Sequence, residues 1–416
     1  MEQISRRGFL QGMTVVGSGL MAGTMISVPA TAADPIKIGH QCDLTGALAS
    51  TGYWRKKTAD AAVKWINKNG GVAGRQLELV TIDTESKVDV GILRLRQLLQ
   101  ENKVDFVLGS EHGGISVASN PIMLEQKAIC LSQSRTDAVT GAAANPFIFR
   151  LMVNTSLAAY AAAPTILTKG WKRWSVIYAD YVWGHAHRDA WLAQFKKADI
   201  AVGNVVSVPV NTPDPLSYVS RIDRSSDAIF IALLGPDMPR VLVALDQLGL
   251  SSKVKVLVDA GFGVFDVLKL GKRAENMWGM DCSPFELADH DTPHERNMRA
   301  EVGIDEHGRE VGTNQACMIG DIWPMWESVS FIKRNVEGSG WKTKDDTAAL
   351  IKYAESNPNY QESALFPQGD LFIRPEDHQA FSDYYVLRVT EGRIRTETKI
   401  PKDKGIYPST INLASK

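Results

Sequence analysis

The sequence lacks any strong excess of charge. Its 416 residues hold 46 Lys and Arg against 47 Asp and Glu, which gives a formal net charge of −1. A nucleic-acid-binding domain concentrates basic side chains to neutralise phosphates, and this balance leaves no such surplus. We therefore expect no nucleic-acid partner.

Short motifs that mark common enzyme sites are missing too. The chain has no GxGxxG after its first expected strand, no GxxxxGK[ST], no GxSxG and no HExxH. The best metal candidate is a run with two carboxylates and two imidazoles: Asp289, His290, Asp291 and His294. Pro293 forbids a regular helix through this run, so an exposed acidic loop is the simpler interpretation. We expect no catalytic residue, no metal and no cofactor.

Cysteines are few. Four of them would permit two disulfides in three pairings: Cys42, Cys130, Cys282 and Cys317. The alternative is that they are buried and unpaired, since a free cysteine behaves as a small apolar side chain. The sequence leaves the pairing open.

The first 33 residues have the features of an export signal. Residues 5–10, SRRGFL, match the twin-arginine pattern; an apolar run at 12–28 follows, and Ala30-Thr31-Ala32 offers a cleavage site. An uncleaved membrane anchor is the alternative, but glycines dilute the run below what a spanning helix needs. We expect twin-arginine export, cleavage near Ala32 and a mature protein in the bacterial periplasm.

The segment from residue 36 to residue 83 predicts a βαβ unit. Apolar and polar residues alternate at 36–40, the helical segment 53–69 follows a polar turn, and a second strand is expected at 77–83. Gly70 and Gly71 supply the left-handed cap that ends the helix. The two strands should be parallel, and ligands bind beyond the carboxyl ends of such strands. Residues 43–51 would then border a site.

Other segments predict helices and strands throughout the chain. A chain of this length exceeds one ordinary core, and strand-loop-helix units recur in both halves, so we expect two α/β lobes. Ser116 is expected to cap a helix that runs to residue 126. A long amphipathic helix is expected at 314–334, and Glu391-Gly392 should form a hairpin turn.

Two motifs resemble a known family. DLTGxLAxxG at 43–52 and NxxGGVxGRxLELV at 67–80, followed by Asp83, resemble the start of the leucine/isoleucine/valine-type periplasmic binding proteins of ABC transporters. The resemblance implies the type 1 fold of these proteins, two Rossmann-like lobes with parallel-sheet cores joined by a three-crossing hinge. We expect lobe 1 to comprise 34–153 and 283–368, and lobe 2 to comprise 154–282 and 369–416.

The resemblance also implies a function. Such a protein captures a small carboxylate-bearing solute between its lobes and delivers it to an ABC permease in the inner membrane. The solute would be a branched-chain or related amino acid, or an aromatic acid, and the protein a monomer without enzymatic activity. A ligand-sensing subunit of a signalling system, with the same cleft, is the alternative.

Site residues follow from the family's strand-end loops, which present hydroxyl and backbone N–H groups to a ligand carboxylate. The matching positions are Gly113, Gly114, Ser134 and Thr136. Arg135 departs from the family, which usually has a small residue there. Its guanidinium could clamp a carboxylate through two hydrogen bonds, or face solvent and pair with Asp137.

The second lobe should supply an aromatic residue and an acid. Trp183 stands where an aromatic covers the ligand in the resembled family, although it could equally pack its own helix. The Glu that pairs with a ligand ammonium in the family is missing, so Asp237 or Asp259 would have to replace it. Aromatic residues are frequent near the expected site: Tyr53, Trp54, Tyr181, Trp183 and Phe262. With Arg135, they favour an aromatic acid about as strongly as the family favours a branched-chain amino acid.

Overall fold

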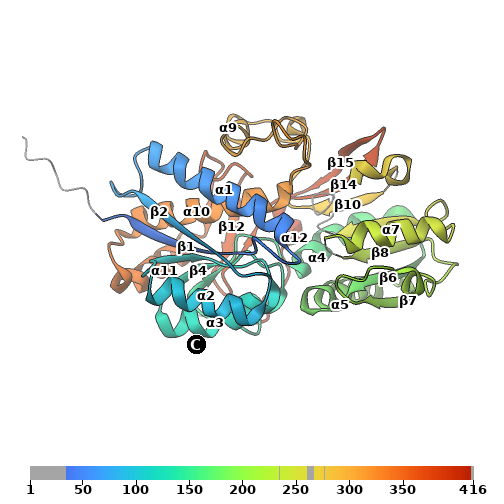
Figure 1. The fold of residues 1–416 in the computed structure, drawn as a ribbon, viewed down its shortest axis with the longest axis horizontal. Coiled ribbons are helices and arrows are strands. Elements are labelled where there is room, and N and C mark those ends of the chain that lie inside the picture. The colour runs from blue at the N-terminus through green and yellow to red at the C-terminus, as the bar shows by residue number, and fades with distance from the viewer. Residues whose placement is uncertain (1–33, 234, 260–266, 276, 414–416) are drawn as a thin grey trace, which may run out of the picture. The chain divides into compact units, whose positions relative to one another are not determined.

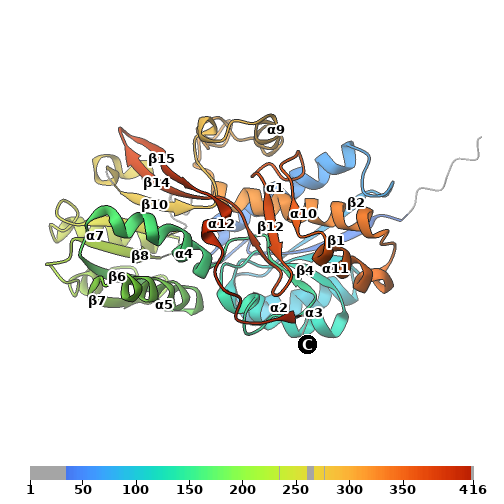
Figure 2. The same ribbon diagram turned by 180° about the vertical axis from the view of Figure 1, so that it is seen from behind.

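Two separate sheets with parallel cores organise the chain in the computed structural model, which describes residues 34–413 except 234, 260–266 and 276. The expected leader at 1–33 and Phe262 lie outside the described residues. Figure 1 and Figure 2 show the two sheets with their helices from opposite sides.

The first sheet has five parallel strands in the order β2-β1-β3-β4-β5. They are β1 (Ile36–Cys42), β2 (Leu77–Asp83), β3 (Phe106–Leu108), β4 (Ile129–Leu131) and β5 (Ile148–Phe149). The connecting helices are α1 (Ala49–Lys68), α2 (Val88–Gln100) and α3 (Gly113–Gln126). Because β1 and β2 pair in parallel across α1, the predicted βαβ unit is confirmed.

The second sheet has seven strands in the order β15-β14-β10-β9-β8-β6-β7. Five are parallel: β6 (Arg173–Ala179), β7 (Ala201–Val208), β8 (Ala228–Ala232), β9 (Lys255–Asp259) and β10 (Trp278–Asp281). The other two, β14 (Tyr384–Thr390) and β15 (Arg393–Ile400), form the antiparallel hairpin predicted at one edge. Its turn residues Glu391 and Gly392 have φ of 52° and 69°, the left-handed pair that tight hairpins favour.

Several helices and a third, small sheet accompany the two larger sheets. The second sheet carries α4 (Thr155–Ile166), α5 (Val182–Lys197), α6 (Leu216–Val219) and α7 (Asp237–Gln247). Later helices are α9 (Pro293–Val302), α10 (Ile319–Ser339), α11 (Thr347–Ser356) and α12 (Lys402–Gly405). Short 3-10 helices are η1 (Asp137–Val139), η2 (Leu167–Lys169), η3 (Val267–Ala274), η4 (Leu287–Asp289) and η5 (Lys344–Asp346). The third sheet is β11 (Asn359–Tyr360), β12 (Leu371–Arg374) and β13 (Gln379–Phe381).

The core of the first sheet lies between its strands and two helix layers. Figure 1 shows α2 and α3 on one face and α1 with α10 on the other. Trp65 of α1 packs on Trp326 of α10 with ring centroids 5.6 Å apart, and Phe149 of β5 packs on Phe331 at 4.9 Å. This packing makes α10, distant in sequence, part of the first lobe.

The chain passes between the two sheets three times. It leaves the first sheet after β5, returns after β10, and passes again between β13 and β14. β13 belongs beside the first sheet, because the backbones of Arg150 and Ala380 are hydrogen-bonded at 2.9 Å. The architecture agrees with the predicted two lobes, while the residue boundaries given for them stay a prediction.

Three predicted helix starts differ from the structure. α1 begins at Ala49 instead of residue 53, and α10 begins at Ile319 instead of 314. Asn314 has φ of 58°, which an α-helix does not allow. His112, not Ser116, caps α3 by accepting from the Ile115 N–H, while Ser116 donates to the Ser110 carbonyl.

All four cysteines are buried and unpaired, which matches the alternative in which they pack as small apolar side chains. Within the described ranges, no helix has both the length and the apolar character that crossing a bilayer requires.

Both lobes use a glycine where a helix meets the end of its strand. A Cβ on Gly52 of α1 would lie 2.0 Å from the Asp43 carbonyl oxygen, and one on Gly184 of α5 would lie 2.0 Å from that of Ala179. Real Cβ atoms do not approach a backbone oxygen so closely. Each glycine therefore allows its helix to lie close to the strand-end loop.

We expect Gly52→Ala to lower the free energy of unfolding by roughly 1–3 kcal/mol, because the backbone must shift to admit the methyl group. Gly405→Ala is the matched control, since its Cβ would meet only Ala161 and Leu157 at 3.5 Å or more. Chemical denaturation of both variants measures the difference. Equal stability of the two would contradict the close approach.

Candidate functional site

Asp43 joins three strand ends of the first sheet. It follows β1, and its carboxylate accepts hydrogen bonds from the Thr84 hydroxyl at 2.6 Å and the Ser110 hydroxyl at 2.8 Å. The Glu111 N–H donates to the same carboxylate at 3.2 Å. Thr84 follows β2, and Ser110 and Glu111 follow β3, so one buried carboxylate aligns the loops after β1, β2 and β3.

The loop after β4 brings three of the predicted residues together. Ser134 and Thr136 are both buried, and the Ser134 hydroxyl accepts from the Thr136 N–H at 3.2 Å. A Cβ on Gly113 would lie 2.2 Å from the Thr136 hydroxyl oxygen, so that hydroxyl lies against the first turn of α3. Among the described residues the Thr136 hydroxyl has no hydrogen-bond partner. Gly114 is in the same turn, where backbone N–H groups lack partners within the helix.

The buried side chain of Arg150 binds the backbone of this loop. Its Nη1 donates to the Ser134 carbonyl at 3.1 Å and to the Thr136 carbonyl at 2.6 Å. Its Nε donates to Gln379 Oε1 at 2.6 Å, and its Nη2 donates to the Thr140 hydroxyl. Burial lowers the pKa of Arg150, and only oxygens of neutral groups accept its hydrogen bonds. A buried guanidinium thus sets the direction of both loop carbonyls.

Two buried arginines form ion pairs beside the loop. Arg55 of α1 donates through Nη2 to Asp321 at 2.7 Å and through Nη1 to the Gln133 carbonyl at 2.8 Å. Arg135 lies 3.3 Å from Asp281 and 3.7 Å from Asp321. Burial opposes the charge on Arg135, but these two carboxylates outweigh it and raise the pKa well above its ordinary value.

Arg135 therefore has carboxylate partners within the protein. It does not pair with Asp137, which accepts hydrogen bonds from the Ser156 N–H at 3.0 Å and hydroxyl at 2.8 Å. Asp281 ends β10 of the second sheet, so the Arg135 ion pair also links the strand ends of the two sheets.

Glu111 adds a carboxylate that the sequence analysis did not single out. Its Oε2 lies 3.8 Å from Arg55 Nε, and 14% of its side chain is exposed. Burial raises the pKa of Glu111 to about 8, although Arg55 opposes this rise; Asp321 and Asp43 add repulsion. The protonated form of this carboxyl group is therefore favoured more than in an ordinary glutamate.

Aromatic rings and a carboxylate lie close together at the strand ends of the second sheet. Trp183 is 5% exposed, and its ring lies 4.3 Å from that of His187 and 6.1 Å from that of Tyr181. His187 Nδ1 lies 2.5 Å from Asp259 Oδ2. The ring of His112, after β3, lies 6.2 Å from that of Tyr181. Trp183 and Asp259 are thus brought together, close to the loops of the first sheet.

Two predicted residues lie in other local networks. Asp237 accepts from the Asn211 N–H at 2.7 Å and from Arg240 Nη1 at 3.2 Å. The Tyr53 hydroxyl donates to Glu310 at 2.5 Å, which raises the pKa of Tyr53 to about 12. Glu310 also binds Lys57 and Thr313, so this network fastens the loop before α10 to α1.

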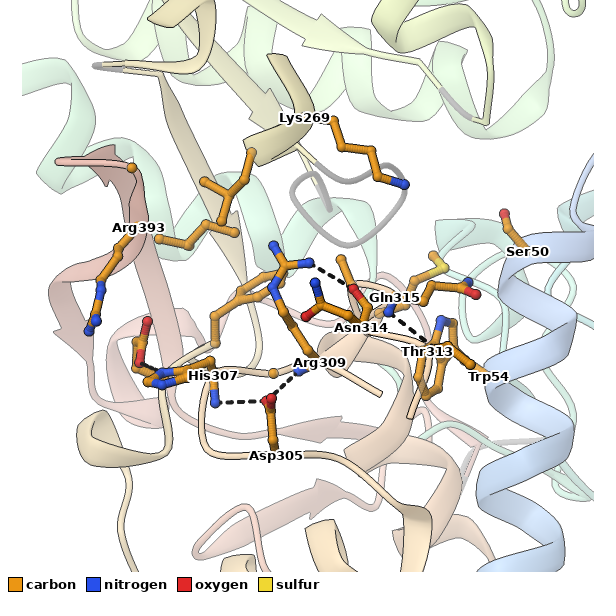
Figure 3. A pocket seen from close by; sticks show the side chains of 18 residues that line it. Ser50, Trp54, Lys269, Asp305, His307, Arg309, Thr313, Asn314, Gln315 and Arg393 are labelled. Carbon is orange, nitrogen blue, oxygen red and sulfur yellow. Dashed lines mark hydrogen bonds and ion pairs between the residues drawn. The ribbon is translucent and has the colours of Figure 1, made fainter. Parts of the chain in front are cut away.

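A cavity of about 930 Å³ opens on another side of α1 (Figure 3). Ser50 and Trp54 line it, one helical turn apart, whereas Arg55 faces the ion pairs described above. Lys269 lies on the opposite wall from Arg309 and Asn314. The sequence predicts two of these residues: Ser50, in the segment 43–51 expected to border a site, and Trp54, through its aromatic character.

Residues of the acidic run at 289–294, which extends into the first turn of α9, contact neighbouring groups of the protein. His290 Nε2 lies 2.9 Å from the Pro367 carbonyl oxygen, and Asp291 forms an ion pair with Arg296. In the part of the chain that the structure describes, no three His, Cys, Asp or Glu residues are grouped to hold a metal.

We expect Arg150→Met to lower the free energy of unfolding by about 3 kcal/mol or more, since it leaves several buried acceptors without a donor. Arg296→Met is the control, because it removes an exposed ion pair, and such pairs contribute little to stability. Urea unfolding compares the two variants. A loss as small as the control's would show that Arg150 does not hold the loop.

Glu111 should make stability depend on pH. Its pKa is about 8 in the folded protein against an ordinary 4.5, so between these values only the unfolded chain releases the proton. Stability therefore falls as pH rises from 4.5 towards 8. Glu111→Gln should be more stable than the parent at pH 8 by on the order of 1 kcal/mol, with a smaller difference at pH 5. The idea fails if the difference in free energy of unfolding between variant and parent is the same at pH 5 and pH 8.

Comparison with known proteins supports this architecture. A family model described as periplasmic binding protein matches residues 35–393. A Leu/Ile/Val-binding protein homologue of Brucella melitensis, homolog 6, is 23% identical over 380 residues, which cover 89% of this chain and 92% of that protein. Homolog 3 of the same organism is 26% identical over 211 residues, 50% of this chain and 57% of that protein. This second match thus spans little more than half of the relative.

Solved structures share the fold. A solute-binding protein of an ABC transporter from Rhodopseudomonas palustris, in complex with 3,4-dihydroxybenzoic acid, has a TM-score of 0.75 and 18% identity; the match covers 89% of this chain and 98% of that one. An amino acid ABC transporter substrate-binding protein from Pseudomonas fluorescens has a TM-score of 0.74 and 20% identity, with coverages of 91% and 97%. These likenesses confirm the predicted type 1 fold. The family match over residues 35–393 shows that the chain belongs to the periplasmic binding protein family.

Proposed function

We propose that this protein captures a small carboxylate-bearing solute in the periplasm and delivers it to the permease of an ABC importer. One observation carries the proposal: the carboxyl ends of parallel strands from both sheets meet in one buried polar cluster. Arg135 after β4 contacts Asp281 at the end of β10, and His112 after β3 lies against Tyr181 after β6. Ligands of open parallel sheets bind at such strand ends.

The proposed solute is a branched-chain or related amino acid, or an aromatic acid. Both classes have support, because one structural neighbour holds 3,4-dihydroxybenzoic acid and another belongs to an amino acid transporter. On the first lobe, the Thr136 hydroxyl and the first-turn N–H groups of α3 offer hydrogen bonds to a polar end of the solute. On the second lobe, Trp183 and Tyr181 offer apolar surface to the remainder.

Solute release and capture would use hinge bending at the three passages between the sheets. Contacts divided between two lobes are all made only when the lobes close on the solute, so the solute favours the closed state. Asn154, at the first passage, caps α4 by accepting from the Leu157 N–H at 2.8 Å. This cap gives the second lobe a defined start beside the hinge.

Export by the twin-arginine route with cleavage near Ala32, a monomeric state and the absence of catalysis belong to the same proposal. A ligand-sensing subunit that uses the same cleft is the second candidate. It differs in its partner, a sensor kinase instead of a permease and ATPase, so the genes next to this one distinguish the two.

We expect a thermal-shift screen of leucine, isoleucine, valine, benzoate and 4-hydroxybenzoate to identify a stabilising solute. Ligand at a hundredfold over its Kd stabilises a protein by about 2.7 kcal/mol, enough for a clear rise in Tm. Failure of every amino acid and aromatic acid to raise the Tm would reject the proposed solute class.

With that solute, Thr136→Val should weaken binding roughly ten- to hundredfold, the effect of losing one hydrogen bond to a charged group. The Tm of the free protein should stay the same, because the Thr136 hydroxyl has no partner among the described residues. Thr58→Val is the control, since its hydroxyl donates to the Trp54 carbonyl within α1. Calorimetry measures both, and native affinity in Thr136→Val would remove the loop after β4 from the site.

A further inference from the structure

Tyr384 lies where the second sheet contacts the loop after β4. It is the first residue of β14, directly after the third passage between the sheets. β14 runs antiparallel to β10, and the next residue, Tyr385, is paired with Asp281 at the end of β10. Asp281 is the carboxylate that binds Arg135 of the loop after β4. Tyr384 is therefore at the edge of the second sheet where its parallel strands end, beside the contact between the lobes.

The hydroxyl group of Tyr384 is buried and has no hydrogen-bond partner among the described residues. A buried tyrosine hydroxyl usually has a partner, because burying a polar group without one costs free energy. Burial raises the pKa of Tyr384 well above its ordinary value; the charges of Asp259 and Asp281 add to this rise, and Arg135 opposes it. The hydroxyl group therefore stays protonated and lies within the range of these three charges.

Other polar atoms without a partner in the described chain lie near Arg135. Thr136 is the next residue, and Thr155 donates its N–H to the Arg135 carbonyl at 3.0 Å; the hydroxyl groups of both threonines are buried and unpaired. His187 Nε2 is unpaired as well, and burial followed by the charge of Arg135 lowers the pKa of His187. With Tyr384, these atoms come from both lobes, which suits a polar ligand that contacts both.

The two lobes differ in the polar groups that they offer. On the first lobe, the Thr136 hydroxyl can donate a hydrogen bond to the solute carboxylate. On the second lobe, the charges of Asp259 and Asp281 act on the Tyr384 hydroxyl, so an anion there would be repelled and a hydrogen-bond donor would be favoured. The Tyr384 oxygen can accept a hydrogen bond from such a donor.

We propose that the Tyr384 hydroxyl selects solutes with a hydrogen-bond donor in addition to their carboxylate: the ammonium group of an amino acid or a ring hydroxyl of an aromatic acid. The inference rests on the proposed solute-binding function and leaves the carboxylate at the loop after β4. An analogue without the donor would leave the Tyr384 hydroxyl buried and unpaired. Protein sites reject analogues that lack a polar group on this basis.

Tyr385 provides a matched control on the opposite face of β14. Consecutive side chains of a strand point to opposite faces, and Tyr385 packs in the same core cluster as Leu387 and Val389, whereas Tyr384 packs in that of Phe381 and Val386. The Tyr385 hydroxyl is also buried without a partner among the described residues. Tyr385→Phe therefore removes the same atom from the same strand, on the other face.

The test compares two pairs of probes: 4-hydroxybenzoate with benzoate, and leucine with 4-methylpentanoate, which lacks the ammonium group. The parent should prefer the donor-bearing member of one pair, and that pair identifies the source of the donor. Tyr384→Phe should weaken binding of that member about tenfold and change binding of its analogue less than about twofold. Tyr385→Phe should bind both as the parent does. Calorimetry measures the affinities, and since both members are measured on the same variant, a general loss of stability would affect them alike.

Three results would overturn the inference. The first is that the parent binds both members of each pair equally. The second is that Tyr384→Phe binds the preferred member as tightly as the parent, or loses the same affinity for both members. These two results leave the proposed solute-binding function standing. The third is that the parent binds none of the four probes, in which case the proposed solute class fails together with the inference.

Discussion

The buried guanidinium of Arg150 is the constraint on which the loop after β4 in the first lobe depends. It donates hydrogen bonds to the carbonyls of Ser134 and Thr136 and to the side chain of Gln379 in β13. Burying an arginine without a carboxylate is costly unless every N–H finds an acceptor. The loop, Thr140 and β13 supply those acceptors, so their positions are determined together. The position of the loop after β4 is thereby fixed by the protein itself.

Buried ion pairs also fix the positions of segments that contact this loop, including a strand end of the second lobe. Asp321 lies in the first turn of α10 and receives Arg55, while Asp281 at the end of β10 receives Arg135. Such pairs contribute little net stability, because desolvation of the charges offsets much of their attraction. Their effect is geometric: removing one partner leaves an isolated buried charge, so the arrangement of strand ends around them is strongly specified. Burial, with repulsion from Asp321 and Asp43, raises the pKa of Glu111 in the same cluster.

Much of the fold could be predicted because it depends on local patterns. The strand Leu77–Asp83 and the hairpin turn at Glu391-Gly392 appeared in the structure at the predicted residues, since alternation and left-handed turn residues are local signals. The start of α10 was wrong, because a single left-handed residue, Asn314, breaks a pattern that otherwise looks helical. Arg150 and Glu111 were missed. A lone charged side chain has no periodicity, and its partners come from separate segments of the chain, such as Gln379 for Arg150 and Arg55 for Glu111.

The buried cations of this protein are arginines, and their contacts suit the chemistry of the guanidinium group. Arginine has a planar group with five donors, which can satisfy several fixed acceptors at once, and Arg55, Arg135 and Arg150 are all used in that way inside the protein. A guanidinium held by buried carboxylates, as in Arg55 and Arg135, cannot change partners without leaving a buried charge unpaired. On the proposed function, these arginines therefore order the strand ends, and a solute would bind to groups without a partner among the described residues, such as the Thr136 hydroxyl.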